Sequence, residues 1–237
     1  VTISVKENLR LKVNSVSFTG NTAYSSWRLK DSIATQHSWL SWIMNTGLYS
    51  KDEAENDKAR LRELYWNKGY LDFNVKKVEA AEDSSDPEYV NVHFDLEEGE
   101  PYKVGKVNVS GNSKFSTEEL MSLISLQEGM ILDNRIEKED IKAIRSKYDP
   151  LGYADFYCEA VRVPDYKTHI VTITYKITEG IPYTVRDLNI SGNVNTKDYV
   201  IRREMVIHPG DPVNPDMIDT SKARLMGMNY FEKVDIV

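Results

Sequence analysis

Carboxylates, imidazoles and thiols are the side chains that most often carry chemistry, and this chain is rich only in carboxylates. Its 237 residues include 37 Asp or Glu, 30 Lys or Arg, four His and one Cys, for a net charge of −7. The enzymatic alternative is therefore a carboxylate hydrolase. Acids at a hairpin tip, such as those between Glu82 and Glu88, are solvated and should keep ordinary pKa values, so we expect no catalytic pair there.

The histidines and the cysteine have no spacing that predicts a metal or a nucleophilic site. His37, His93, His169 and His208 are scattered, and none has ligand spacing to another. Cys158 supplies no disulfide or redox pair and is expected to pack as a small apolar residue on a strand. No P-loop or GxGxxG motif occurs. The sequence therefore predicts no metal, no cofactor and no enzyme.

Composition narrows the remaining classes. With 41% hydrophobic and 28% charged residues, the chain has a globular composition rather than a disordered one. Its pI of about 5.3 disfavours a nucleic-acid partner and a surface for anionic lipids, because both need clustered Lys and Arg. The sequence begins and ends inside strand-like runs, so we expect it to be a piece of a longer protein.

One arrangement of elements recurs along the chain. A strand-like run followed by Gly-Asn occurs at Gly20, Gly111 and Gly192, with spacings of 111 − 20 = 91 and 192 − 111 = 81. Twelve residues before each of these glycines stands a Gly or Asn preceded by an acid. This fixed length argues against a floppy linker. The three acids are Glu7, Glu98 and Glu179.

Each repeat reads as a β-α-α-β-β module. The predicted fold class is α+β, with tandem modules that each have a three-stranded mixed sheet covered on one face by two helices. Residues 1–8 are expected to be the last strand of a preceding module. The modules themselves span residues 9–99, 100–180 and 181–237. The third should stop before its last strand, with Phe231 to Val237 as its second strand.

Helix starts are marked by side chains that can accept the first backbone N–H groups. Ser50 with Glu53 forms a capping box for a long helix, and Ser116 with Glu119 forms another. A short helix should begin near Ser25 or Ser26. In the third module the expected N-caps are Thr196 and Asn214, the latter followed by Pro215.

Helix ends carry a second repeated signal. Gly69 and Gly152 follow the second helix of their modules, and Asn229 stands at the matching point of the third. Glycine takes a positive φ without strain, and asparagine is the usual substitute. These three structural corners should therefore all adopt the left-handed backbone conformation.

The corner and the last helices resemble a known family. Gly-Asn after the first strand and the run Tyr65-Trp66-Asn67-Lys68-Gly69-Tyr70-Leu71-Asp72 resemble POTRA domains, the polypeptide-transport-associated repeats. Val200 to Met205, Ala223 to Leu225 and Tyr230 to Val234 resemble the POTRA domain that precedes a membrane barrel. In a family member with five POTRA repeats before its barrel, this chain resembles the third, fourth and fifth.

The resemblance implies a non-enzymatic periplasmic arm of a Gram-negative outer-membrane protein, joined to a C-terminal membrane β-barrel. Its expected partners are unfolded outer-membrane proteins and the accessory lipoproteins of the barrel assembly machinery. Val206 to Pro209 is uncharged where the family tends to carry charged lipoprotein contacts. An arm of a related transporter, of the autotransporter-assembly or two-partner secretion type, remains the alternative.

The resemblance also suggests which strand is open. An edge strand presents unpaired N–H and C=O groups, so a client strand can add to it whatever the client's sequence. We expect the second strand of each module to be this edge, near 71–78 and 155–163, with Lys76, Lys77 and Glu79 as charged guards. The candidate residues of the client-strand edge are Leu71, Phe73, Val75, Phe156, Cys158 and Ala160.

Two further sets are candidates for partner docking. An insert near 37–49 concentrates aromatic residues and forms either an exposed apolar patch or, as we favour, a lid on the helices of its own module. Near the C-terminus, a charged set forms either a docking site or an ordinary solvated helix face. The candidates are Trp39, Trp42 and Tyr49 in the insert, and Arg202, Arg203 and Glu204 near the C-terminus.

Overall fold

The computed structural model describes residues 11–35 and 48–236. The predicted strand at 1–8 and the docking candidates Trp39 and Trp42 lie outside these residues. The chain forms two compact units. Unit 1 comprises residues 1–103, 129–134 and 165–170, and unit 2 comprises residues 104–128, 135–164 and 171–237.

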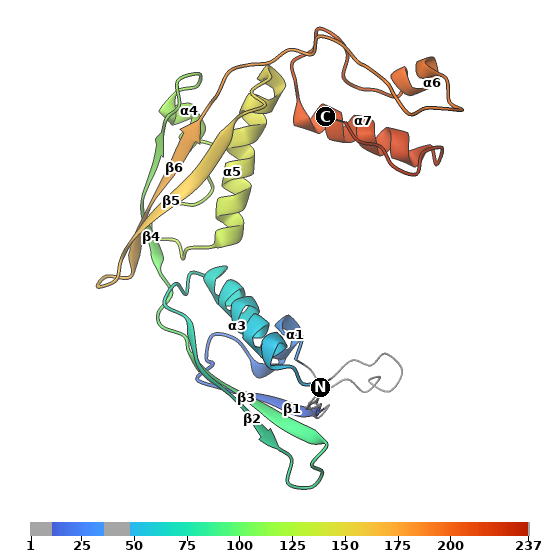
Figure 1. The fold of residues 1–237 in the computed structure, drawn as a ribbon. Helices are drawn as coiled ribbons and strands as arrows, with labels where there is room; N and C mark the ends of the chain where they lie inside the picture. The colour runs from blue at the N-terminus through green and yellow to red at the C-terminus, as the bar shows by residue number, and fades with distance from the viewer. Residues whose placement is uncertain (1–10, 36–47, 237) are drawn as a thin grey trace, which may run out of the picture. The chain divides into compact units, whose positions relative to one another are not determined.

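The first sheet lies in unit 1 and has the strand order β1-β3-β2 (Figure 1). β1 (Lys12–Thr19) runs parallel to β3 (Tyr89–Glu97), and β2 (Asn74–Glu82) runs antiparallel to it. The predicted three-stranded mixed sheet is thus confirmed. The strand that comes last in the sequence lies in the middle and pairs with both others.

Two helices pack on this sheet. Ser25 accepts a hydrogen bond from the N–H of Arg28 at the start of α1 (Ser26–Ser32), and Ser50 accepts one from Glu53 at the start of α3 (Lys51–Trp66), as predicted. Alternate residues of β1 and β3 meet apolar residues of both helices. The centre of this core is fully buried and includes Leu29, Leu61, Tyr65, Val92 and Phe94.

The second sheet repeats this order as β4-β6-β5, formed by β4 (Lys103–Ser110), β5 (Tyr157–Asp165) and β6 (Ile170–Thr178). Its helices are α4 (Thr117–Met121) and α5 (Asn134–Tyr148), followed by the short 3-10 helix η1 (Asp149–Leu151). Ser116 caps α4 by accepting from the N–H of Glu119, which confirms the second capping box.

The three corner residues have the predicted left-handed backbone conformation. After the two corner glycines, the next strand starts later in the sequence than predicted. Gly69, Gly152 and Asn229 have φ values of 81°, 86° and 57°. β2 begins at Asn74 and β5 at Tyr157, three and two residues later than predicted. The reason is that the backbone after each glycine still turns.

The third module has helices but no strand within the described residues 183–236. α6 (Asp198–Arg202) and α7 (Pro215–Gly227) enclose a small apolar core. The first strand expected before Gly192 and the second strand expected at 231–237 are not formed by the described residues, which make an isolated bridge between Thr184 and Pro212. The physical reason is the strand order: outer strands need a central partner, and no counterpart of β3 or β6 is present here.

Of the two predicted caps in this module, one is confirmed. Asn214 accepts a hydrogen bond from the N–H of Asp216, with Pro215 at the first helical position. Thr196 is not the cap of α6, because the helix begins one residue later than expected and Lys197 occupies the cap position without a side-chain hydrogen bond. The carbonyl of Thr196 instead accepts from Asn193 Nδ2 at 2.9 Å.

Candidate strand-binding edges

Each complete sheet has an edge formed by its second strand in sequence, β2 or β5. Because β3 and β6 occupy the middle positions, the outer sides of β2 and β5 pair with no other strand in the described part of the chain. Such a side offers main-chain donors and acceptors to an extended segment. The strand order agrees with the expected open edge, whereas its use by a client stays a prediction.

Three of the predicted edge residues precede the strands. Leu71, Phe73 and Phe156 lie in the turns that follow the corner glycines. Both phenylalanines are only 3% exposed, and each ring stacks on a tyrosine of the preceding helix, Tyr65 or Tyr148. These side chains therefore build the core and are not placed to meet a partner.

The other three predicted residues lie within the strands. Val75 and Cys158 are buried, and Ala160 is half-buried. Burial raises the pKa of the Cys158 thiol to about 11, so this cysteine stays protonated and unreactive at neutral pH. A strand added here would meet the backbone of these residues rather than their side chains.

The edge of β2 carries charge. Lys77 pairs with Glu79, and the Lys76 ammonium lies 3.5 Å from a Glu97 carboxylate oxygen. The hydrogen bond from Lys77 holds the pKa of Glu79 below its usual range. The predicted guards are thus exposed along this edge, where an incoming apolar strand would have to strip water from them.

The edge of β5 is mostly apolar instead, although it also carries Glu159, whose carboxylate accepts from the Tyr157 hydroxyl at 3.3 Å. Arg162 turns toward the helices, where its guanidinium binds the buried carboxylate of Glu137 on α5 at 2.6 Å and 2.8 Å. Successive strand residues alternate between faces, so Tyr157, Val161 and Val163 share the opposite face. They are 58%, 40% and 62% exposed. Sequence reasoning missed these three residues, although Val161 and Val163 stand on either side of Arg162 in the sequence.

A short repeated segment holds the chain after each sheet. The pattern Glu-Gly-x-Pro-Tyr occurs at 98–102 and again at 179–183. The N–H of Tyr102 donates to the carbonyl of Gly69 at 2.9 Å, and that of Tyr183 donates to Gly152 at 2.8 Å. A Cβ atom at Gly152 would lie 2.4 Å from the Tyr183 carbonyl oxygen, so this corner needs glycine for close approach as well as for its positive φ.

The tyrosine of the same pattern reaches back to an aspartate. Tyr102 donates its hydroxyl hydrogen to Asp72 at 2.9 Å, and Tyr183 donates to Asp155 at 2.6 Å. Burial, together with the Asp72 carboxylate, raises the pKa of Tyr102 to about 12. Each pair lies within a single unit. Sequence reasoning used the acid and glycine of this pattern but missed its tyrosine.

Glu98 is a buried hydrogen-bond centre in unit 1. Its carboxylate accepts from the backbone N–H groups of Thr22 at 2.9 Å and Ala23 at 3.0 Å, and from the hydroxyl of Tyr65 at 2.5 Å. Burial pushes the pKa of Glu98 upward, but these hydrogen bonds outweigh it and hold the pKa below its usual range. Glu98 thereby ties the end of β3 to the turn after β1.

Glu179 repeats this arrangement in unit 2. It accepts from the N–H groups of Ser113 at 2.8 Å and Lys114 at 2.9 Å, and from the Tyr148 hydroxyl at 2.8 Å. Burial opposes ionisation here too, yet the hydrogen bonds lower the pKa to about 2. A carboxylate so saturated with donors is a poor general base, so the repeated acid is structural.

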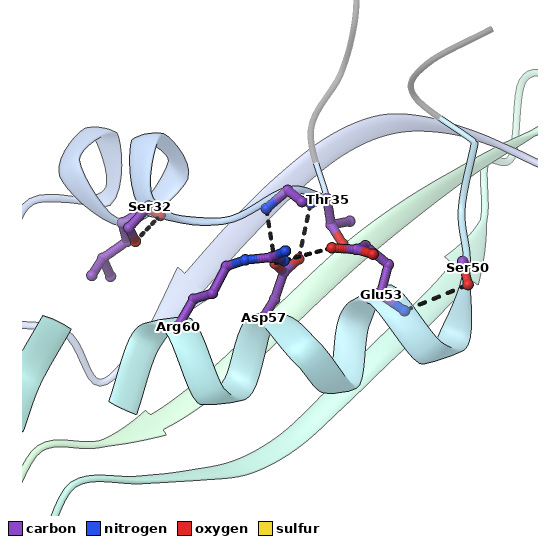
Figure 2. A network of polar contacts seen from close by, with 8 residues as sticks. Ser32, Thr35, Ser50, Glu53, Asp57 and Arg60 are labelled. Carbon is purple, nitrogen blue, oxygen red and sulfur yellow. Dashed lines mark hydrogen bonds and ion pairs between the residues drawn. The ribbon is translucent and has the colours of Figure 1, made fainter. Parts of the chain in front are cut away.

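A second repeated acid anchors the loop between the helices of each module. Asp57 on α3 accepts from the N–H groups of Ala34 at 2.8 Å and Thr35 at 2.9 Å, and binds Arg60 at 2.5 Å. Figure 2 shows Asp57 between Thr35 and Arg60. Asp140 on α5 accepts from Ser125 at 2.7 Å and Leu126 at 3.1 Å. Sequence reasoning missed both, although their spacing, 140 − 57 = 83, equals that of the corner glycines, 152 − 69 = 83.

The third module uses a hydroxyl at this place. Ser221 on α7, at a spacing of 221 − 140 = 81, accepts from the N–H of Val206 at 2.9 Å. It is fully buried and also donates to the carbonyl of Met217 at 2.7 Å. The same backbone demand is thus met in all three modules by a short polar side chain on the second helix.

The acidic hairpin loop departs from one expectation. Asp83 accepts from the hydroxyl and the N–H of Ser85 and from Asn91, and these hydrogen bonds hold the pKa of Asp83 well below its usual range. The expected ordinary pKa of this tip is therefore wrong for Asp83. The shift favours the charged form, which disfavours a role as a general acid.

The docking candidates are only partly placed. Tyr49 is half-buried against the core of unit 1 and donates its N–H to the carbonyl of Leu11 at 2.8 Å. Arg202 donates to the carbonyl of Leu188 at 2.9 Å, and Arg203 lies 3.3 Å from Glu204. A docking role for these residues stays a prediction.

Within 11–35 and 48–236, no three His, Cys, Asp or Glu side chains come together as a metal site. None of the helices in these ranges has the length and hydrophobicity of a transmembrane segment.

Comparison with known proteins places the chain in a class. The family described as "POTRA: Surface antigen variable number repeat" matches residues 11–99, 102–180 and 183–237. A repeated β-α-α-β-β module with a central last strand is the class that the fold defines. The chain belongs to the POTRA family.

Individual relatives agree with this assignment. The chain is 30% identical to outer membrane protein assembly factor BamA of Neorickettsia risticii, over all of this chain and 32% of the relative. It is 28% identical to BamA of Nitratidesulfovibrio vulgaris, over 98% of this chain and 30% of the relative. The chain thus spans about a third of the length of these curated relatives.

A solved structure gives the same answer. POTRA3-5 of Haemophilus influenzae BamA matches with a TM-score of 0.71 and 25% identity, covering 95% of this chain and 88% of that one. The chain is therefore similar to POTRA domains 3 to 5 of that BamA. The resemblance seen in the corner and helix residues is confirmed.

Proposed function

We propose that this chain is the periplasmic receiving arm of a β-barrel assembly factor in the outer membrane. In this role it is a scaffold and not an enzyme, and a membrane β-barrel belongs to the same full-length protein. The similarity to BamA over the whole chain supports this proposal. The chain would bind unfolded outer-membrane proteins by strand addition and dock accessory lipoproteins.

The observation that carries the proposal is the unpaired outer side of β5 beside exposed apolar side chains. Strand addition draws its affinity from main-chain hydrogen bonds, and the neighbouring side chains give preference for one class of strand. Membrane β-strands alternate apolar and polar residues. Such a strand, paired on β5, can place its apolar residues beside Tyr157, Val161 and Val163.

A titration with two matched peptides tests strand addition. A ten-residue peptide of alternating apolar and polar residues is added, up to about 1 mM, to isotope-labelled chain, and amide shifts are followed. We expect shifts along β5. The control peptide has the same sequence with N-methylated backbone amides on its pairing side. Equal shifts with both peptides, or none on β5 or β2, would contradict strand addition.

Lipoprotein docking is tested separately. The double substitution Arg202→Glu with Arg203→Glu reverses the exposed charge beside α6, where both side chains lie at the surface. We expect it to weaken capture of the lipoprotein subunits by the full-length protein without altering peptide shifts on β5. Unchanged capture would remove these residues as the docking site.

A further inference from the structure

The hairpin between β5 and β6 carries a histidine at its tip. His169 has a φ of 51°, in the left-handed region that few residues other than glycine and asparagine enter readily. Its carbonyl accepts the N–H of Lys103 at 2.8 Å, and its ring lies edge-on to Tyr102 at 5.2 Å between centroids. The tip thus rests against the Glu-Gly-x-Pro-Tyr segment within unit 1.

Carboxylates surround the imidazole on several sides. Nδ1 lies 3.4 Å from an oxygen of Glu100 in the linker, and Nε2 lies 3.9 Å from an oxygen of Asp72 in the turn before β2. On its own hairpin, Asp165 lies close enough for the His169 charge to help lower the Asp165 pKa, after hydrogen bonds from Lys167 and Thr168. Tyr102 and Tyr166 also face this cluster, and Tyr102 donates to Asp72.

We propose that His169 is a pH-sensitive latch that fastens the hairpin tip to the linker when protonated. Histidine is the side chain whose charge ordinarily changes between pH 5 and 8. A protonated ring gains charge attraction to Asp72 and Glu100, whereas a neutral ring lacks this attraction and keeps the backbone hydrogen bond and the aromatic contacts. Lowering the pH therefore tightens the contact of residues 165–170 with residues 98–103.

The second copy of the linker segment supplies an internal contrast. Ile181 stands at the place of Glu100 in the repeated pattern, and the tyrosine and aspartate partners are otherwise the same. The carboxylate that approaches Nδ1 is therefore specific to the first linker. Replacing Glu100 by isoleucine converts the first linker to the chemistry of the second.

Amide hydrogen exchange of Lys103 measures the latch, because this N–H bonds to the His169 carbonyl. Protection factors, corrected for the intrinsic effect of pH, are compared at pH 8 and pH 5.5 in the whole chain. For ion pairs that remain partly exposed, we expect a rise of about two- to fivefold at the lower pH. The Tyr183 amide, bonded to Gly152, is the internal reference and should not change.

Two variants complete the test. His169→Asn keeps a residue that tolerates positive φ but cannot titrate, so it should abolish the pH-dependent rise while leaving protection at pH 8 unchanged. Glu100→Ile should reduce the rise to less than half. A wild-type protection factor that is equal at both pH values overturns the proposal, as does an undiminished rise in His169→Asn.

Discussion

The two complete sheets differ at their edges but share one frame, by which we mean the strand order, the corner glycines and the buried acids. β1-β3-β2 and β4-β6-β5 have the same strand order, and a glutamate fastens each sheet to a turn. On β2, however, Lys77 and Glu79 form an exposed ion pair, whereas on β5 the only arginine is turned to α5. One module thus guards its edge with an exposed ion pair, while the other leaves its edge mostly apolar, with Glu159 hydrogen-bonded to Tyr157.

This difference teaches how a repeat can diverge without losing its fold. The exposed side chains of the edges contribute little to the core, so they are free to change, whereas the buried acid and the glycines are held by backbone contacts. We therefore expect substitutions in the frame to affect stability and substitutions at the edge to affect binding. The effects on stability should be larger than the effects on binding.

The largest effect is expected where glycine touches the central strand. A Cβ at Gly111 would lie 2.1 Å from the Ile177 carbonyl oxygen, and φ is 82°. Gly111→Ala should destabilise unit 2 by about 2–4 kcal/mol, from overpacking and a left-handed backbone. Thermal and denaturant unfolding measure it. A Cβ at Gly20 would lie equally close, 2.1 Å, to the Leu96 carbonyl oxygen. If the two sheets are equivalent here, Gly20→Ala should destabilise unit 1 by the same amount.

Gly192 is the matched control for this prediction. It has the same φ of 82°, but no atom lies within 4 Å of its Cβ position. Gly192→Ala should therefore cost only the backbone strain, about 1 kcal/mol. Equal losses at Gly111 and Gly192 would show that the central strand is not what makes these positions demanding.

The second prediction concerns the acid of unit 2. The pKa of Glu179 is depressed to about 2, so its stabilisation is fully present above the unfolded value near 4.5 and is lost as pH falls toward 2. Glu179→Gln should destabilise by about 2 kcal/mol at pH 7 and by much less at pH 2.5. Chemical denaturation at both pH values measures this. A pH-independent loss would mean that the charge of Glu179 is not what holds the turn.

The sequence predicted the frame better than the edges, and the reason is the range of the interactions. Capping boxes such as Ser50 with Glu53 and corners such as Gly69 depend on residues within a few positions of each other. The spacing of the repeat then identified three copies of the module. Local signals of this kind are visible without knowing the fold.

What the sequence did not predict depends on contacts between distant residues. Asp57 and Asp140 look like solvated helix residues until the loop that they bind is placed over them. The strands of the third module failed because pairing needs a central strand, and the module was predicted to stop before its last strand without the central place of that strand being used. Likewise, the inward direction of Val75 and Cys158 follows from where the helices cover the sheet.

The third prediction concerns a charge introduced on the edge of β5. Val161→Lys places a charge on β5 like that of Lys77 on β2, and should weaken binding of the alternating peptide about fivefold to tenfold, because the ammonium must be desolvated. Amide-shift titration gives the dissociation constant. Thr174→Lys on the central strand β6 is the control for added charge alone. If both lysines weaken binding equally, net charge rather than the β5 edge is responsible.

The smallest effect is expected from opening the guarded edge. Lys77→Val with Glu79→Val removes the ion pair on β2, whose two side chains are exposed and which therefore contributes little to folding. The melting temperature should stay unchanged, while peptide-induced shifts should now appear along β2 as they do along β5. If β2 still binds nothing after its charges are removed, its edge is closed by backbone geometry. The bulge between Val75 and Lys77 would then be the cause, because a bulge twists the strand and interrupts the regular spacing of its donors and acceptors.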